Sequence, residues 1–308
     1  MDKTQVSVIF VNYNTEKMTI EAVKSVFDKT ENVIFEVFVV DNASSDNSVN
    51  GFKKAFGDKI TVIESKENLG FGGGNNLGIK ASKGKYVFLL NTDTLLINNA
   101  IKILFDFMEQ NPQAGVCGGS LYGAEGKPVG SFRKRFLQEN ESVICKIFRA
   151  LKMFISGNLS GHFNFGDKNI KVDVITGADM MIRREALIKS GLFDTDFFMY
   201  LEEDELTVRI TKNGYFSYFV PAAKITHLVY GSFKGSELSG KRLAMYAYGE
   251  FLFFEKVYGK DAVKKYYKKS LLFIRIINVL TLGIIRKFCL QKEKTLNDAY
   301  LLWQAKRG

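Results

Sequence analysis

Short apolar runs alternate with segments of helical spacing along roughly the first 120 residues. The runs expected to form strands are residues 6–11, 35–40, 59–64 and 86–90. Between the first two runs, Ile20, Val23 and Phe27 recur at helical spacing. The second run is apolar except at Glu36, which is typical of a parallel strand buried on both faces. This order predicts an α/β fold with a mostly parallel sheet and helices on both of its faces.

The pattern changes after residue 130. Residues 131–171 break into basic, aromatic and Gly/Asn-rich stretches, which we interpret as a mobile excursion from the domain. Strand and helix patterns return between 172 and 220, and beyond Ser239 the chain is helical, basic and aromatic. We therefore expect one α/β domain over residues 1–240 and a helical C-terminal segment over residues 241–308.

The net charge of +10 is concentrated in residues 133–149 and 256–294. The sequence has no zinc-finger, RNA-binding or helix-turn-helix pattern, so we expect no nucleic-acid partner. Anionic lipid or a phosphorylated ligand explains clustered charge equally well. Within the C-terminal segment the longest uncharged run, residues 276–285, is far shorter than the ~20 residues that span a bilayer. Two alternatives stay open: basic amphipathic helices on an anionic membrane surface, or helices that pack on the domain or in a homodimer.

The three cysteines are far apart in the sequence and fit no metal-ligand spacing. Free thiols in a reducing compartment are the simplest interpretation. The N-terminus leads directly into a strand and shows no signal-peptide pattern. We therefore expect a cytoplasmic protein, with the inner face of the cell membrane as the alternative location.

Polar residues follow the predicted strands at their carboxyl ends, where sheets of this kind bind ligands. The candidates are Asn12, Asn14, Asp41, Asn91, Thr92 and Asp93. Asp41 could accept the ring N–H of a pyrimidine or a ribose hydroxyl, or could simply cap the next helix. A divalent cation bridges a carboxylate such as Asp93 to a diphosphate, and a single acid needs the phosphates to complete its site.

Residues 67–74 form a glycine-rich loop, and we expect a short helix to follow from Asn75. The loop matches neither the dinucleotide-binding nor the Walker pattern. Adjacent glycines let the backbone approach an anion closely, and a following helix offers free N–H groups. A flexible turn is the alternative.

Four consecutive acids, residues 202–205, open a predicted helix. We expect Glu205 to pair with Arg209 across the surface, since they are four residues apart. Glu202 and Glu203 share the face of Leu206, so one of them is placed to look into a cleft, whereas Asp204 lies on another stripe. A solvated helix start is the alternative. His227 closes a strand-like segment, where a histidine is as often structural as functional.

The order of these motifs resembles glycosyltransferase family two, closest to its bacterial rhamnosyltransferase-like branch. Similarity covers about residues 5–235. The motifs that carry it are Asn12-Tyr13-Asn14, Val39-Val40-Asp41-Asn42-Ala43-Ser44-Ser45-Asp46, Glu67-Asn68-Leu69-Gly70-Phe71-Gly72-Gly73-Gly74-Asn75-Asn76, Leu90-Asn91-Thr92-Asp93, Thr176-Gly177-Ala178-Asp179, Gly191-Leu192-Phe193-Asp194, Tyr200-Leu201-Glu202-Glu203-Asp204 and His227.

The resemblance implies a GT-A fold, here with a C-terminal helical extension, and an inverting transfer from a UDP- or dTDP-sugar that uses Mg²⁺ or Mn²⁺. Asp41 would contact the base, residues 68–70 would lie near the ribose, and Gly74 and Asn75 would complete the donor site. Asp93 would bind the metal and His227 would approach the metal or the diphosphate. The family pattern places the catalytic base at Glu203. The usual Asp-x-Asp is here Asn91-Thr92-Asp93, which implies weak metal affinity.

A saccharide or polyprenyl-linked saccharide is the implied acceptor, with residues 131–171 on its side of the site. Rhamnose transfer in surface-polysaccharide synthesis is the guess that the branch suggests. A sugar nucleotidyltransferase is the first alternative, although the first strand leads into Asn12-Tyr13-Asn14 and not into a basic glycine-rich loop. A non-catalytic module that binds nucleotide sugars is the second.

Overall fold

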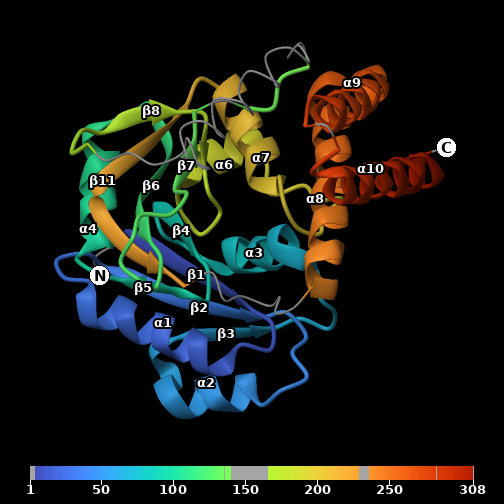
Figure 1. The fold of residues 1–308 in the computed structure, drawn as a ribbon. Coiled ribbons are helices and arrows are strands. Elements are labelled where there is room, and N and C mark those ends of the chain that lie inside the picture. Colours follow the sequence, from blue (N-terminus) through green and yellow to red (C-terminus); the bar gives the residue numbers. More distant parts are fainter. Residues whose placement is uncertain (1–3, 135, 140–165, 229–235, 282, 308) are drawn as a thin grey trace. The chain divides into compact units, whose positions relative to one another are not determined.

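The structure is a computed structural model that describes residues 4–134, 136–139, 166–228, 236–281 and 283–307. These residues form two compact units. The first unit holds the described residues up to 136, together with 166–198 and 206–228. The second holds 137–139, 199–205 and the described residues from 236 onward. Figure 1 labels the elements of both.

A nine-stranded sheet forms the centre of the first unit. Its strands are β1 (Val6–Asn12), β2 (Phe35–Asp41), β3 (Thr61–Glu64), β4 (Tyr86–Leu90), β5 (Thr94–Leu96), β6 (Ala114–Tyr122), β8 (Ile170–Val172), β10 (Asp179–Arg183) and β11 (Phe216–His227). They follow the order β3-β2-β1-β4-β10-β6-β11-β5, with β8 paired to β11 (Figure 1). The four strands predicted from the first 90 residues form a parallel ladder. Because β10 is antiparallel to both β4 and β6, the complete sheet is mixed rather than mostly parallel.

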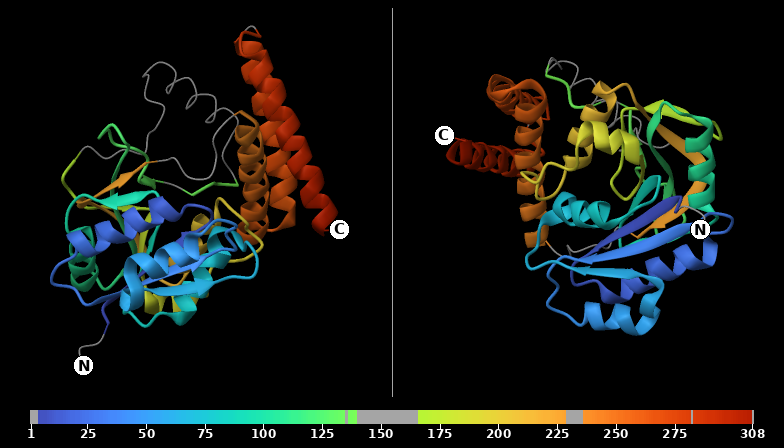
Figure 2. Two further views of the ribbon diagram at one scale, coloured as in Figure 1. Left: turned by 90° about the horizontal axis from the view of Figure 1, so that it is seen from below. Right: turned by 180° about the vertical axis from the view of Figure 1, so that it is seen from behind.

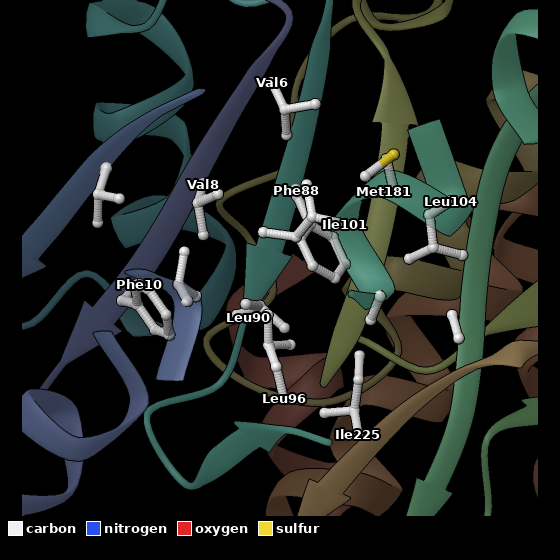
Figure 3. Close-up of a cluster of buried hydrophobic side chains, with 14 of the residues drawn as sticks. Val6, Val8, Phe10, Phe88, Leu90, Leu96, Ile101, Leu104, Met181 and Ile225 are labelled. Atoms are coloured by element: carbon white, nitrogen blue, oxygen red, sulfur yellow. The ribbon is translucent and has the colours of Figure 1, made fainter. Parts of the chain in front are cut away.

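Helices cover both faces of this sheet. They are α1 (Glu16–Lys29), α2 (Ser48–Phe56), α3 (Gly70–Ala81), α4 (Ala100–Gln110), α6 (Arg184–Ser190) and α7 (Glu202–Lys212). Successive strand residues point to opposite faces, so Val8 and Phe10 pack toward α1, α2 and α4, a cluster that Figure 3 shows in part. Ile9 and Leu89 pack toward α3, α6 and the part of α7 in the first unit. The predicted α/β fold is therefore confirmed.

The glycine-rich segment is helical, which corrects the predicted loop. Helix α3 begins at Gly70, so Gly72, Gly73 and Gly74 lie inside it, and Asn75 is not its start. A Cβ at Gly78 would lie 2.6 Å from Ile9 Cγ2, and one at Gly74 would lie 2.7 Å from Val11 Cγ1. These glycines therefore serve close packing of a helix on β1, despite their low helix propensity.

The two ends of the predicted excursion contain short strands, which the sequence pattern did not predict. Strand β7 (Phe132–Arg133) pairs with β9 (Val174–Ile175) in a small second sheet, and β8 joins the main sheet. Phe132 packs on Phe219 of β11, with 4.8 Å between the ring centroids. The remainder of the predicted excursion, residues 140–165, lies outside the described residues.

Three helices form most of the second unit: α8 (Ser236–Tyr258), α9 (Lys260–Leu280) and α10 (Arg286–Arg307), which pack side by side (Figure 2). Aromatic side chains make their core. Tyr267 of α9 stacks on Tyr300 of α10 at 3.9 Å, and Phe254 of α8 stacks on Tyr266 of α9 at 4.1 Å. These rings account for the interleaved aromatics of the sequence, and the predicted C-terminal helices are confirmed. None of the helices in the described ranges is long and apolar enough to cross a membrane.

Candidate active site

The carboxyl ends of β1 and β2 are joined by Asn12 and Asp41, which face each other in the sheet register. The Asn12 amide donates to Asp41 Oδ1 at 2.8 Å and to Ser44 Oγ at 3.0 Å. Its carbonyl accepts from the hydroxyls of Thr15 and Thr19, both at 2.8 Å. The side chain of Asn12 is thus fully used in orienting the buried carboxylate of Asp41.

The loops after β1 and β2 also bind each other. Asn14 has a φ of 54° and donates its N–H to Ser44 Oγ at 2.9 Å. Asn14 Oδ1 accepts from the N–H of Ser45 at 2.8 Å. Asp41 Oδ2 accepts from the N–H of Ser44 at 3.0 Å. Because Asp41 and Asn14 are held from several sides, the edge of the site near β2 is preorganised.

Asn42 is a site residue that the sequence-based prediction did not select. Its amide donates to Asn68 Oδ1 at 2.9 Å and to the Gly70 carbonyl at 3.1 Å, and its Oδ1 accepts from the Leu69 N–H at 3.0 Å. It therefore fixes the turn that leads into α3. Its position directly after Asp41, in the polar cluster that ends β2, was the available signal.

The start of α3 needs glycine for a second reason. Gly70 has a φ of +71°, and a Cβ there would lie 2.0 Å from the Phe198 carbonyl oxygen. That carbonyl accepts from the Phe71 N–H at 3.0 Å. Asn75 is buried and donates to the Phe71 carbonyl at 3.0 Å. The structure thus shows Gly70, Gly74 and Asn75 in packing and turn formation, and their contact with a donor stays a prediction.

The turn after β4 carries the candidate metal ligand. Asn91 donates its N–H to the Ala178 carbonyl at 3.1 Å, and its own carbonyl accepts from the Thr94 hydroxyl at 2.7 Å. Thr92 Oγ1 lies 3.2 Å from Thr15 Oγ1. The single proton of the Thr15 hydroxyl is donated to Asn12, so the Thr92 hydroxyl donates to Thr15, and hydrogen bonds connect Asp41, Asn12, Thr15 and Thr92 along one edge of the sheet.

Asp93 and His227 come together although 134 positions separate them in the chain. Strand β11 pairs with β5 so that His227 lies opposite Thr94, and His227 Nε2 lies 3.3 Å from Asp93 Oδ1. The Leu228 N–H donates to the Asp93 carbonyl at 2.9 Å, which fixes the end of β11 beside the turn. Both side chains are largely buried. The two residues that the family resemblance assigns to the metal site are thus neighbours in the fold, and their binding of a metal stays a prediction.

These two side chains fit a divalent cation that a substrate helps to bind. A carboxylate and an imidazole are accepted ligands of Mn²⁺ and related ions. Across the described residues no group of three or more His, Cys, Asp or Glu side chains could hold a metal alone. Further oxygen ligands would therefore come from a bound diphosphate or from water.

The acids that open α7, residues 202–205, belong to the second unit. Glu202 and Asp204 are buried, whereas Glu203 is partly exposed. Glu205 is also buried, so it does not lie on the surface as predicted, and its pairing with Arg209 stays a prediction. The Arg209 guanidinium donates to the carbonyls of Ser190 and Leu192. Of these four acids, Glu203 is thus the one with appreciable solvent access.

Helix α8 supports the residues that precede these acids, which sequence reasoning missed. Tyr200 and Leu201 both have left-handed backbone conformations, with φ of 75° and 72°. The Tyr200 ring lies 6.0 Å from the Tyr246 ring, and the Arg242 guanidinium lies 5.8 Å from the Tyr200 centroid. A Cβ at Gly249 would lie 2.7 Å from the Tyr200 carbonyl oxygen. The strained pair is therefore held by contacts from α8.

Asp179 is a buried carboxyl in the centre of the sheet. Its Oδ2 accepts from the Gly119 N–H at 2.6 Å, and no hydrogen bond is made by the buried Oδ1. Burial raises the pKa of this carboxyl well above its usual range, and the Gly119 hydrogen bond opposes that rise only in part. Asp179 lies opposite Leu90 of β4 and follows Ala178, which anchors Asn91. It therefore helps to hold the Asn91–Asp93 turn in place.

A protein-family profile described as Glycosyl transferase family 2 matches residues 7–191. A glycosyltransferase of Rickettsia bellii, whose function is uncharacterised, is 38% identical over 35% of this chain and 15% of its own length. The poly(ribitol-phosphate) β-N-acetylglucosaminyltransferase TarP of Staphylococcus aureus is 28% identical over 74% of this chain and 73% of its own. The N-acetylglucosaminyl-diphospho-decaprenol L-rhamnosyltransferase of Mycobacterium tuberculosis is 24% identical over 62% and 66%.

Two solved structures share the fold. A mannosyltransferase of Pyrobaculum calidifontis, in complex with GDP-Man and Mn²⁺, aligns with 99% of this chain and 88% of its own at a TM-score of 0.59. GalNAc-T7, with UDP, GalNAc and Mn²⁺, aligns with 97% of this chain and 55% of its own at a TM-score of 0.62. Both are 16% identical to this chain. The likeness confirms the predicted GT-A fold.

Proposed function

Because the chain belongs to glycosyl transferase family 2, we propose that it moves a sugar from a pyrimidine nucleotide-diphosphate donor to a hydroxyl of a saccharide or lipid-linked saccharide. The observation that carries the proposal is the hydrogen-bonded series Asp41–Asn12–Thr15–Thr92, next to the Asp93–His227 pair. Asn12, Asp41 and the turn with Thr92 and Asp93 follow strands of the parallel ladder at its carboxyl edge, where ligands of such sheets bind.

The base of the nucleotide is assigned to Asp41. Its carboxylate is buried and held by Asn12 and by the Ser44 N–H, so its direction is fixed. A carboxylate in this position accepts the ring N–H of uracil or thymine. This supports a UDP- or dTDP-sugar, with Asn14 and residues 68–70 completing the donor site.

The diphosphate is assigned to the turn with Asn91, Thr92 and Asp93. A bound Mg²⁺ or Mn²⁺ at Asp93 and His227 would supply positive charge for the departing diphosphate. Both side chains are already adjacent, 3.3 Å apart. A binding site that is fixed before the reaction stabilises developing charge without a reorganisation cost.

Glu203 is proposed as the catalytic base of an inverting displacement. The acceptor oxygen would attack the anomeric carbon from the face opposite the diphosphate, the carbon–oxygen bond to the diphosphate would break, and Glu203 would take the hydroxyl proton. The family pattern and its greater exposure favour Glu203 over Glu202 and Asp204. Both neighbours remain catalytic candidates that the same substitutions test.

The acceptor class and the sugar rest on the relatives. By their names, one acts on poly(ribitol-phosphate) and one on a decaprenol-linked saccharide. A polyprenyl-linked acceptor would place this enzyme at the inner face of the cell membrane. Rhamnose is the first sugar to test, since the M. tuberculosis relative is a rhamnosyltransferase.

A panel of UDP-, dTDP- and GDP-sugars tests the function. We expect release of nucleoside diphosphate from a UDP- or dTDP-sugar, faster with Mn²⁺ and much slower in Glu203→Gln. A nucleotidyltransferase would instead exchange pyrophosphate with the nucleoside triphosphate. Binding of a nucleotide sugar without any turnover would favour the alternative function, a non-catalytic module that binds nucleotide sugars.

A further inference from the structure

Apolar side chains are exposed where α9 ends and α10 begins. Ile284 is 85% exposed, Val279 72% and Phe288 56%. Leu280 and Leu290 are exposed as well. We call the exposed residues 279, 280, 284, 288 and 290 the α9–α10 tip. Isolated exposed apolar residues are ordinary, but several large ones on one turn and its flanking helix ends indicate a surface that meets a partner.

The charged residues between positions 270 and 292 have one sign. Residues 270–292 contain Arg275, Arg286, Lys287 and Lys292 and no acid. Arg275 donates to Glu293 Oε1 at 2.7 and 3.1 Å, so its charge is compensated. Arg286 and Lys287 are exposed beside Ile284 and Phe288. Lys292 lies 5.7 Å from the centroid of the Phe288 ring.

We propose that the α9–α10 tip docks the protein on an anionic lipid surface, with Ile284, Phe288 and Val279 entering the boundary between headgroups and acyl chains. Arg286 and Lys287 would lie at the level of the lipid phosphates. Apolar residues flanked by cations are typical of protein segments that lie in a membrane interface without crossing it. This accounts for apolar residues that the core of the helical unit leaves exposed.

A second copy of the chain is the competing occupant, and the charges disfavour it. In a twofold dimer the same patch meets itself. The exposed Arg286 and Lys287 would then face a patch of the same charge, with no acid of residues 270–292 to compensate them. Anionic headgroups supply the opposite charge.

Lipid binding needs neither nucleotide nor metal, so it is independent of the donor chemistry. A membrane-held acceptor, which rests on the proposed function, would share one surface with the enzyme. Failure of lipid binding would leave sugar transfer untouched, and failure of transfer would leave lipid binding untouched.

Vesicle flotation of the full chain tests the proposal. We expect the wild type to float with phosphatidylcholine vesicles that contain phosphatidylglycerol, to float less as salt rises, and to stay down with pure phosphatidylcholine. Ile284→Ser with Phe288→Ser should lower the bound fraction by at least ~10-fold. Arg286→Gln with Lys287→Gln should remove most of the salt dependence.

Ile97→Ser with Ile188→Ser is the matched control, because both side chains are exposed apolar residues of the first unit. It should float like the wild type. Circular dichroism would verify that all variants remain folded. A wild type that never floats with anionic vesicles at low salt overturns the proposal. So does sedimentation of a lipid-free dimer that Ile284→Ser with Phe288→Ser converts to monomer.

Discussion

At the residue scale, the assignment of the catalytic base rests on how accessible each carboxylate is to solvent and acceptor. A general base must meet the acceptor hydroxyl, and Glu203 is partly exposed while Glu202 and Asp204 are buried. Glu203→Gln keeps the shape of the side chain but cannot take a proton. We expect the transfer rate to fall ~10²-fold or more while donor affinity stays nearly constant. Steady-state rates together with nucleotide titrations would measure both.

Glu202→Gln and Asp204→Asn are the comparisons for that experiment. If Glu203→Gln turned over normally while one of the two neighbouring variants lost activity, the catalytic base would be assigned to that neighbour. If all three variants stayed active, these acids would have no catalytic role and would serve only as the N-terminal residues of α7.

The raised pKa of the Asp179 carboxyl predicts that the stability of the protein depends on pH. Its pKa is raised by burial, so the folded protein holds a proton that the unfolded chain releases above about pH 4. The stability that Asp179 contributes is complete below that pH and is lost as the pH rises toward its folded pKa. Asn carries no such proton and can still accept from the Gly119 N–H. The stability of Asp179→Asn relative to the wild type should therefore increase between pH 4 and 7, as measured by urea unfolding; a constant difference would contradict a raised pKa.

At the element scale, the first four strands and their polar ends were predictable because apolar runs and the residues after them are local patterns. Asp41 and Asp93 follow from that rule alone. The antiparallel β10 between β4 and β6 was not predictable, because strand order is set by tertiary packing. The helical glycines of α3 were missed for a related reason: their low helix propensity is overridden by the close approach to Val11 and Ile9.

Helix α8 offers a test of how one element supports another within the second unit. At Gly249, a Cβ would lie 2.7 Å from the Tyr200 carbonyl oxygen, so Gly249→Ala must displace the left-handed residues before the acids. We expect lower stability and slower transfer. Gly240→Ala in the same helix meets nothing within 4 Å and should stabilise by up to ~1 kcal/mol, since alanine favours the helix. Equal effects of the two substitutions in urea unfolding would exclude this support.

At the scale of the whole molecule, the residues proposed for the reaction are divided between the two units, although their motifs follow one another along the sequence. The residues assigned to the donor and the metal lie in the first unit, while the proposed base and the α9–α10 tip lie in the second. A ligand bound only to the folded state raises apparent stability by RT ln(1 + [L]/Kd), about 2.7 kcal/mol at 100 Kd. Donor nucleotide should therefore stabilise the first unit. If the helical unit unfolds in a separate transition, the temperature of that transition should not change.

Asp93→Ala makes this prediction specific to the metal. With UDP and Mn²⁺ together, the wild type should unfold at a higher temperature than with UDP alone, because the cation links Asp93 and His227 to the diphosphate. In Asp93→Ala the increment due to Mn²⁺ should largely disappear, while the shift from UDP alone persists through Asp41. Asp41→Asn should show the reverse, with weak binding of UDP whether or not Mn²⁺ is present. Equal binding in EDTA and Mn²⁺, for the wild type and Asp93→Ala alike, would remove the metal from Asp93 and leave its contact with His227 as a structural pair.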